Sequence, residues 1–277
     1  MSILTSILLG IIQGLTEFLP ISSTAHLTIA GKLLGLINPD RPEEWTAYIA
    51  VMQIGTLIAV LAYFSRDLIV ITRGFVVDGI QFVRTPGKGL GNARMGWYII
   101  LGTIPVATIG MLLRKVIEGK LTKNLTVIGI SLIALALILW FAERHSSRTK
   151  KIGDATWLDS VLIGCAQALA LIPGSSRSGT TITAALLLGI TREDAARFSF
   201  LLSIPAVFAS GMLELYRMRH FIQDLGIMNV IASTAAAAIV GYASIALLLK
   251  YLRTHSTMVF IYYRIILGVA ILGMMYG

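Results

Sequence analysis

The stretch G-I-I-Q-G-L-T-E-F-L-P-I-S-S-T-A-H, residues 10–26, interrupts an otherwise apolar sequence with polar side chains and a proline. A second stretch, G-C-A-Q-A-L-A-L-I-P-G-S-S-R-S-G at residues 164–179, has nearly the same pattern. The two align with one deleted residue, and the aligned positions are Gln13 with Gln167, Pro20 with Pro173, and Ser22-Ser23 with Ser175-Ser176. A near-repeat of this kind predicts that the chain contains two copies of one structural unit.

The two copies differ in the ionisable side chains that they carry. The first contains Glu17 and His26, whereas the second contains Arg177. Ionisable side chains are costly inside a membrane protein and indicate functional sites there by default. An acid/base group in one copy and a permanent cation in the other predict an active site that forms where the two copies meet.

The composition predicts an integral membrane protein. Hydrophobic residues make up 56% of the 277 residues and charged residues 13%, against roughly 25% charged residues in a soluble domain. A helix needs about 17–25 predominantly apolar residues to cross the hydrocarbon core of a bilayer. Six apolar segments are predicted to cross: 46–64, 97–113, 125–142, 198–213, 228–249 and 258–276.

The polar stretches lie in two longer segments, 3–36 and 158–190, and each segment precedes three crossings. Pro20 and Pro173 break them midway, because proline lacks a backbone donor and disfavours helix in the preceding residue. We therefore predict two helical hairpins that enter the membrane and return to the same side, surrounded by protein or a water-filled cavity. Three crossings per copy invert the second copy relative to the first, as in many transporters.

The predicted fold is an all-α polytopic membrane protein with six transmembrane helices and two re-entrant helical hairpins, arranged as inverted-topology repeats. The chain forms a single integral membrane domain, residues 1–277. Repeat one covers about 1–145 and repeat two about 157–277. The glycine-rich stretch 84–96 is predicted to be a flexible connector.

The loops carry most of the net charge of +9 and predict the orientation. One face of the predicted fold carries 13 Lys and Arg residues, in the loops 65–96, 143–157, 191–197 and 250–257. The other face carries 7, in the loops 37–45, 114–124 and 214–227. Because basic loops stay in the cytoplasm, both termini and the mouth of the first hairpin are predicted to face outward from the plasma (inner) membrane.

Charge and cysteine usage exclude other classes of protein. Basic loops suit anionic lipid headgroups, and no stretch resembles a nucleic-acid-binding module. Cys165 is the only cysteine, which excludes an intramolecular disulfide and a CxxC metal or redox motif. The expected partners are the membrane and its lipids, without nucleic acid, and a homodimer is one candidate assembly.

Arg177 lies in a run of small residues that suits phosphate. Gly174 and Gly179 let backbone N–H groups approach an anion closely, and a helix that begins near Ser178 would add its N-terminal donors. A planar guanidinium with these donors forms a phosphate cradle. The hydroxyls available to it are Ser175, Ser176, Ser178, Thr180 and Thr181. The alternative is that Arg177 only pairs with Glu17, so that each neutralises the other.

Ser23 and His26 are three residues apart, and a helix that starts after Pro20 places them on one face. A serine hydroxyl becomes a nucleophile when an adjacent base removes its proton, and histidine is the usual base. Glu17, on the incoming arm of the same hairpin, could orient His26, act as the base itself or help to hold a divalent cation. The alternative is that the Ser-x-x-His spacing is a coincidence without function.

Two other polar residues have open roles. Gln13 could form a hydrogen bond within the site or one between helices. Arg264, in the sequence Y-Y-R of the last crossing, is expected to neutralise a buried partner or to meet a lipid headgroup, rather than to act in catalysis.

The motif Q-G-L-T-E-F-L-P-I-S-S-T-A-H resembles the first signature of the undecaprenyl-diphosphate phosphatase family, also known as the bacitracin-resistance protein type. P-G-S-S-R-S-G resembles its second signature. The resemblance extends over the whole chain in length, spacing and number of crossings. It implies a membrane phosphatase that removes one phosphate from the C55 isoprenoid diphosphate and so recycles the lipid carrier for cell-wall glycans.

The resemblance also implies roles for individual residues. The catalytic set would be Glu17, Ser23, His26 and Arg177, and the phosphate contacts would be Ser22, Thr24, Ser176, Ser178, Thr181 and Arg177. The family is associated with a divalent cation, Mg²⁺ or Ca²⁺. Gln13 stands where many members have a glutamate, and a neutral amide binds Mg²⁺ more weakly than a carboxylate. Glu17 is therefore the stronger candidate ligand and Gln13 the weaker one.

Inverted repeats alone would also suit a carrier or flippase for a phosphorylated polyprenyl lipid. Such a carrier needs the cationic cradle but not an activated nucleophile. The presence of Ser23 and His26 together with Glu17 therefore favours the phosphatase.

Overall fold

A computed structural model describes residues 1–84, 93–113, 117, 119, 123–217 and 226–276. Residues 85–92 of the expected connector, and parts of the loops 114–124 and 214–227, lie outside the described residues. The described chain is helical apart from turns and one isolated parallel bridge between Lys150 and Ile190. The prediction of an all-α protein is confirmed for this part of the chain.

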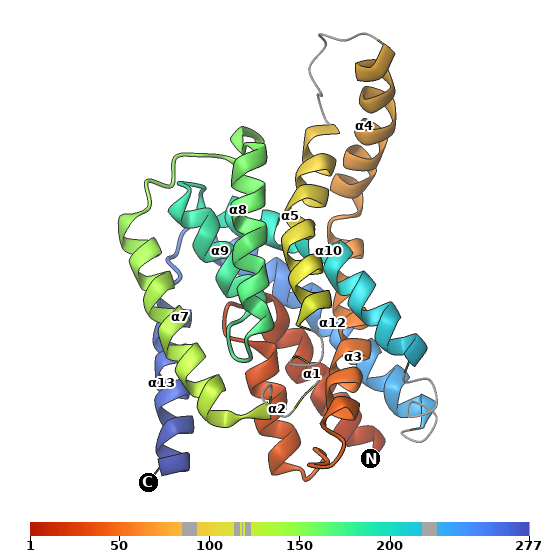
Figure 1. Cartoon of the computed structure of the whole chain (residues 1–277), viewed down its shortest axis with the longest axis vertical. Coiled ribbons are helices and arrows are strands. Elements are labelled where there is room, and N and C mark those ends of the chain that lie inside the picture. The colour runs from red at the N-terminus through yellow and green to blue at the C-terminus, as the bar shows by residue number, and fades with distance from the viewer. Residues whose placement is uncertain (85–92, 114–116, 118, 120–122, 218–225, 277) are drawn as a thin grey trace.

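Among the described residues, six helices are long and apolar enough to cross a membrane, and each contains one predicted crossing or nearly all of it. They are α3 (Pro42–Tyr63), α5 (Ala93–Leu112), α7 (Leu125–His145), α10 (Arg192–Arg217), α12 (Ile227–Leu252) and α13 (Met258–Tyr276). The protein is therefore a multi-pass membrane protein. Figure 1 shows both termini at one end of the bundle, opposite the end from which α4 projects.

The two polar segments form pairs of short helices separated by a break. The first pair is α1 (Ile3–Phe18) and α2 (Ser23–Leu33); the second is α8 (Trp157–Ala168), followed by the 3-10 turn η3 (Leu169–Leu171), and α9 (Arg177–Leu187). With 16 residues, α1 is about 24 Å long, which is shorter than the roughly 30 Å hydrocarbon core. In Figure 1, α1 and α2 lie toward the end that holds the termini, and α8 and α9 toward the opposite end.

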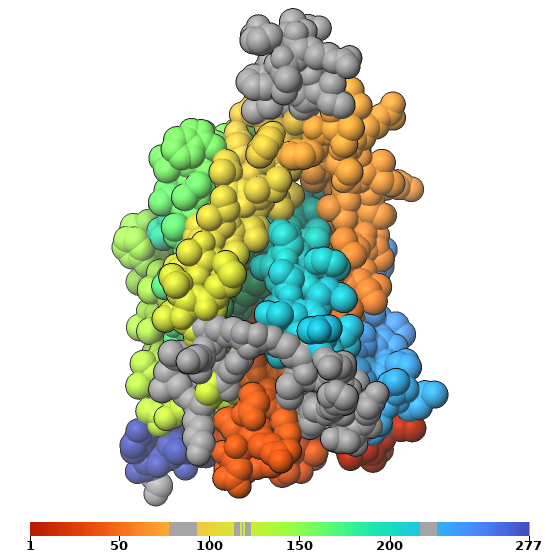
Figure 2. All heavy atoms as spheres, turned by 45° about the vertical axis from the view of Figure 1, so that its right-hand side comes forward, coloured from red at the N-terminus to blue at the C-terminus, as the bar shows by residue number. Residues whose placement is uncertain are grey.

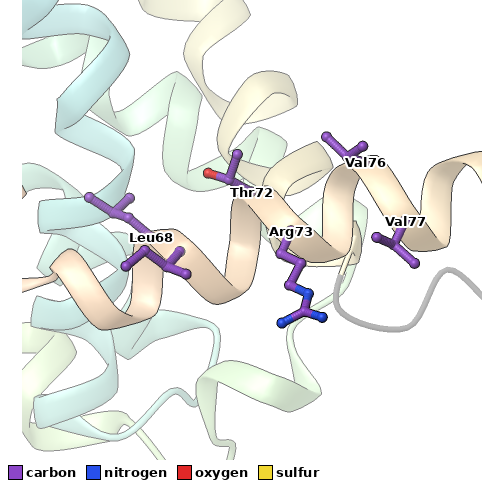
Figure 3. A pocket seen from close by; sticks show the side chains of 6 residues that line it. Leu68, Thr72, Arg73, Val76 and Val77 are labelled. Atoms are coloured by element: carbon purple, nitrogen blue, oxygen red, sulfur yellow. The ribbon is translucent and has the colours of Figure 1, made fainter.

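The prediction that residues 65–96 form a loop is wrong for the first part of this segment. Residues 65–84 form the helix α4 (Ser65–Arg84), which projects beyond the bundle beside the start of α5 (Figures 1 and 2). Its arginines lower the mean hydropathy below that of a crossing, although apolar residues such as Ile69 and Val76 recur at helical spacing. A shallow hollow of about 480 Å³ runs along α4 and is lined by six residues of this helix alone (Figure 3).

The first helix of each pair packs closely against a long helix from the other half of the chain. α1 packs on α12, where a Cβ added to Gly10 would lie 2.2 Å from the carbonyl oxygen of Ser233. α8 packs on α5, where a Cβ added to Gly164 would lie 2.1 Å from the carbonyl oxygen of Gly102. Glycine at these two aligned positions therefore permits backbone-to-backbone contact.

α2 and α9 have the same local geometry. Both contain 11 residues, and their N-cap residues Ser22 and Ser176 have φ of 76° and 67°, a region that non-glycine residues rarely adopt. Each N-cap hydroxyl accepts a hydrogen bond from the backbone three residues later, and each helix is followed by a positive-φ glycine, Gly35 or Gly189. The structure thus aligns Ser22 with Ser176, one residue away from the sequence alignment. The offset of 154 residues is the same as between Gln13 and Gln167, so no residue is deleted between the two copies across the break, and Pro173 lies one position earlier in its copy than Pro20.

Candidate active site

The two breaks meet inside the bundle, and packing fixes the end of α1 there. Phe18 is fully buried and makes an edge-to-face contact with Phe200 of α10 at a centroid distance of 5.2 Å. Such aromatic pairs stabilise a core beyond the area that they bury. Because Glu17 immediately precedes Phe18, this contact holds its carboxylate between the two pairs of short helices.

Glu17 is the centre of the polar network at this junction. Its Oε2 accepts hydrogen bonds from Gln13 Nε2 at 2.8 Å and from Ser23 Oγ at 2.7 Å. Its Oε1 accepts a 2.9 Å bond from Arg177 Nη2. The side chain is only 3% exposed, so three charge-assisted bonds compensate for the loss of hydration of the carboxylate.

Ser23 and Arg177 occupy equivalent positions in the two copies. Each is the first residue of a helix whose N-cap is a serine of positive φ, and each donates a hydrogen bond to Glu17. The unpaired N–H groups of the two helix N-termini also lie at this junction, where they favour an anion. The hydroxyl and the guanidinium thus approach one carboxylate from opposite halves of the chain.

Arg177 retains a free donor after pairing with Glu17. Its Nη1 is buried and has no partner within the described part of the chain, and the same holds for Gln13 Oε1. A buried donor without a partner costs on the order of 1–3 kcal/mol. The ion pair that neutralises both charges is therefore present, but it leaves one donor of the guanidinium available to a further acceptor.

His26 has partners other than Ser23 and Glu17 in the described structure. Its Nδ1 lies 2.7 Å from the carbonyl oxygen of Ser22, and its Nε2 lies 2.6 Å from the hydroxyl of Tyr263. A carbonyl can only accept, so in the neutral ring Nδ1 carries the proton and Nε2 accepts from Tyr263. The rings of His26 and Tyr263 are stacked with an interplanar angle of 6°.

Most of the predicted phosphate-binding hydroxyls lie around the two breaks. Ser176 Oγ is 3.2 Å from Ser178 Oγ, and Ser178 Oγ donates to the carbonyl oxygen of Leu19 in the other half of the chain. Thr24 is partly exposed in the first turn of α2. Thr181 is buried and contacts the hydroxyl of Ser199 on α10 at 2.6 Å, so its side chain already serves the packing of α9.

Arg264 joins the two breaks to each other. It is fully buried; its Nη2 donates to the carbonyl oxygen of Ser175 at 3.0 Å and its Nη1 to that of Pro20 at 3.5 Å. Within the described part of the chain it has no carboxylate partner, in contrast to the neutralisation expected from the sequence. Broken helices expose unpaired carbonyl groups, and a guanidinium from α13 satisfies one in each copy.

Tyr263 was not among the residues predicted from the sequence, and Arg264 had no predicted role at the junction. Both lie in the sequence Y-Y-R of α13, which is more than 80 residues from either break. The only signal was the cost of a cation within an apolar helix, which indicates a function without naming the partner.

The side chains at the junction also indicate how a metal ion could be bound there. No group of three or more His, Cys, Asp or Glu side chains that could hold a metal occurs in the described residues. Glu17 is the one carboxylate at the junction, and Gln13 Oε1 is a buried oxygen without a partner in the same part of the chain. Mg²⁺ is usually held by one or two carboxylates together with substrate phosphates and water. The residues therefore fit a cation that the protein would bind together with a phosphate ligand, rather than one that the protein holds alone.

The fold and the junction define a class of protein: a helical membrane protein with a buried site that combines a carboxylate, a hydroxyl and a guanidinium. Residues 6–270 match the family model of the bacitracin resistance protein BacA, so the chain belongs to that family.

Two similar proteins carry the same name. The chain is 52% identical to the undecaprenyl-diphosphatase of Syntrophobacter fumaroxidans over 277 residues, which cover all of this chain and 98% of the relative. It is 49% identical to the undecaprenyl-diphosphatase of Chlorobaculum tepidum over 285 residues, which cover 99% of this chain and 97% of the relative.

Proposed function

We propose that this protein is an undecaprenyl-diphosphatase, a membrane phosphatase that converts the C55 isoprenoid diphosphate into the monophosphate and inorganic phosphate. The observation that carries the proposal is the bonding of Ser23 and Arg177 to the two oxygens of Glu17. A hydroxyl beside a base and a guanidinium with a free donor are the groups that phosphoryl transfer requires. The names of the relatives supply the substrate.

In the first step, Ser23 Oγ attacks the terminal phosphorus of the diphosphate. Its proton passes to Glu17, whose Oε2 is 2.7 Å away. The bond from this phosphorus to the bridging oxygen breaks, the lipid monophosphate leaves with the electron pair, and a phosphoserine remains. Glu17 is favoured over His26 as the base in this step because only Glu17 accepts a hydrogen bond from Ser23 in the described structure.

In the second step, water attacks the phosphoserine and releases inorganic phosphate and Ser23. His26 lies one helical turn from Ser23, and its partners Ser22 and Tyr263 fix the ring so that Nε2 is an acceptor. We assign the proton of the attacking water to the Tyr263 oxygen, as the Tyr263 hydroxyl passes its own proton to this nitrogen. The proton held by Glu17 returns to Ser23 Oγ as the phosphorus–oxygen bond breaks.

The remaining groups of the junction bind and orient the phosphates. Arg177 Nη1 donates to a terminal phosphate oxygen, and the N-termini of α2 and α9 add backbone donors with the hydroxyls Ser22, Thr24, Ser176 and Ser178. Phosphoryl transfer passes through a loose transition state, so positioning and charge neutralisation supply most of the acceleration. Thr181 acts indirectly, because it ties α9 to α10.

A divalent cation, Mg²⁺ or Ca²⁺, fits the junction as a partner of the substrate. Glu17 and the amide oxygen of Gln13 would hold it together with diphosphate oxygens, so the amide that is the weaker candidate by sequence becomes a second ligand through its free Oε1. Such an ion would neutralise phosphate charge. The protein groups described above keep their roles in binding, orientation and proton transfer.

In the membrane, we assign the two pairs of short helices to re-entrant hairpins from opposite faces. The aligned glycines Gly10 and Gly164, and the matched N-caps Ser22 and Ser176, support inverted repeats over about 1–145 and 157–277. The basic loops support an orientation with the α4 end in the cytoplasm, in which the site would open to the outer face of the inner membrane.

The test is phosphate release from a long-chain prenyl diphosphate by the purified protein in detergent. We expect the parent to release phosphate, and Glu17→Gln to be slower by on the order of 10²–10⁴-fold, the usual contribution of a general base. Glu43→Gln is the matched control, because Glu43 is an exposed carboxylate at the start of α3. Release that is absent in the parent, or equal in both variants, would contradict the proposed function.

A further inference from the structure

A cavity that is partly lined by charged side chains lies away from the junction, where α4, α5 and α10 meet the 3-10 turn η2 (Ile152–Asp154). Its volume is about 460 Å³. The three helices lie side by side on the face shown in Figure 2. The cavity is close to the first turns of α5 and α10, which are both candidate membrane spans, and this places it at the level of lipid headgroups.

The cavity has an excess of positive charge. Three guanidinium groups line it, from Arg66, Arg94 and Arg197, against the single carboxylate of Asp67. Asp67 Oδ1 accepts a 2.9 Å bond from Arg197 Nη2. In the described structure Arg66 and Arg94 form no ion pair, so two positive charges are left without a protein counter-charge.

Two of these cations are held in place before any ligand arrives. The guanidinium of Arg197 lies 5.3 Å from the ring centroid of Phe64 while it pairs with Asp67. Arg94 lies 6.0 Å from the ring centroid of Tyr98, and its Nη2 is 3.4 Å from the hydroxyl of that residue. Stacking on aromatic faces reduces the side-chain entropy that arginine would lose on binding.

The rest of the cavity is apolar. Val70 from α4, Met95 from α5 and Leu201 from α10 line it beside the arginines. A free phosphate ion would use only the charged part, whereas a membrane lipid offers an anionic phosphate together with apolar chains. Basic pockets between transmembrane helices at the cytoplasmic side suit the headgroups of anionic lipids.

We propose that this cavity is a binding site for the phosphate group of an anionic membrane lipid, with Arg66 and Arg94 as its free cations. It lies apart from the Glu17 junction and takes an intact lipid as a ligand rather than as a substrate. The lipid would tie α4 to α5 and α10 at the membrane surface.

The test is binding of phosphatidylglycerol and phosphatidylcholine to the full chain in detergent, measured by native mass spectrometry. We expect the parent to retain phosphatidylglycerol preferentially. The double variant Arg66→Gln/Arg94→Gln should bind it about 25-fold more weakly, at about fivefold for each arginine near a membrane surface. Arg73→Gln is the matched control, because Arg73 lies on the same helix but lines the hollow of Figure 3 instead.

The Arg73→Gln control distinguishes lipid binding in this cavity from general electrostatic attraction of lipid to the basic surface. If Arg73→Gln weakens binding as much as Arg66→Gln or Arg94→Gln, the attraction is diffuse and the site is refuted. Inorganic phosphate added at millimolar excess tests whether the cavity binds free phosphate instead of a lipid headgroup. Displacement of the lipid at that level would overturn the assignment to a lipid, and retention of the lipid would support it. Both arginines are exposed, and an unchanged elution volume of the variants would establish that they fold.

Discussion

Glu17 and Arg177, separated by 160 residues in the chain, form a 2.9 Å ion pair between the two copies of the repeated element. The pair leaves Arg177 Nη1 buried without a partner in the described structure, and it leaves Glu17 Oε2 bonded to Ser23. One carboxylate thus orients both a hydroxyl and a cation. The proposed catalysis depends on this shared carboxylate, and the following experiments separate its parts.

Replacement of Arg177 by lysine should not preserve activity. A guanidinium can bond Glu17 through one nitrogen and phosphate through another, whereas an ammonium is a single point charge. We expect Arg177→Lys to lower kcat/KM by on the order of 10²–10³-fold, the effect of one lost contact to developing charge. The measurement is steady-state phosphate release with a prenyl diphosphate.

The control for this variant is Arg41→Lys, since Arg41 is exposed at the start of α3 and pairs only with Glu44 in the described structure. Activity of Arg177→Lys within about threefold of the parent would mean that the ion pair is only structural and that the phosphate cradle is wrong.

Loss of the Tyr263 hydroxyl should affect the proton transfer that we assign to His26. Tyr263→Phe keeps the stacked ring and removes the 2.6 Å hydrogen bond to Nε2. One hydrogen bond contributes about 1 kcal/mol, so kcat should fall by roughly fivefold with KM unchanged. The pH dependence of kcat should change as well, which a purely structural role would not cause.

Tyr262→Phe provides the comparison, because Tyr262 is the exposed neighbour of Tyr263 on α13. Equal effects of the two substitutions on the pH dependence would refute the positioning of His26 by Tyr263.

Close backbone packing should make Gly164 intolerant of a side chain. A Cβ there would lie 2.1 Å from the carbonyl oxygen of Gly102, a backbone atom that cannot move aside easily. We expect Gly164→Ala to destabilise the fold by about 1–3 kcal/mol, although alanine is the better helix former. Thermal unfolding in detergent measures this effect. Gly153→Ala is the control, because nothing lies within 4 Å of its added Cβ; equal unfolding temperatures of the two variants would contradict the packing described here.

The proposed orientation can be tested with single cysteines in a Cys165→Ser background, since Cys165 is exposed. Asp40→Cys lies in the loop between α2 and α3, and Gly153→Cys lies in η2, which lines one cavity together with residues of α4. An impermeant thiol reagent applied to whole cells should label Asp40→Cys only. Labelling of Gly153→Cys instead would invert the orientation and place the mouth of the first hairpin in the cytoplasm.

The sequence predicts the crossings better than it predicts α4. Apolar length alone identifies α3 and the five other candidate spans, since a bilayer requires that length. α4 escapes this criterion because Arg66 and Arg73 lower its hydropathy, so the segment resembles a basic loop despite its helical spacing. Propensity and length describe one segment at a time, whereas a projecting amphipathic helix is stabilised by its neighbours.

The sequence likewise predicts some contacts of the candidate site and misses others. The repeated motifs alone predict that Glu17 and Arg177 lie together, because duplication implies that the copies meet. Helical spacing suggests His26 as the partner of Ser23, but the break after α1 folds Glu17 back onto that hydroxyl instead. Tyr263 lies 237 residues from His26, and no local pattern relates positions so far apart.

The most direct test of the mechanism is to look for phosphate on Ser23. The purified protein would be mixed with a prenyl diphosphate labelled in its terminal phosphate, quenched in acid and digested, beside Ser23→Ala and Ser22→Ala. We predict label on the peptide that contains Ser23, loss of turnover with nearly unchanged substrate binding in Ser23→Ala, and a milder loss in Ser22→Ala. Substantial phosphate release by Ser23→Ala, with no labelled peptide from the parent, would contradict the covalent mechanism and show that water attacks the diphosphate directly.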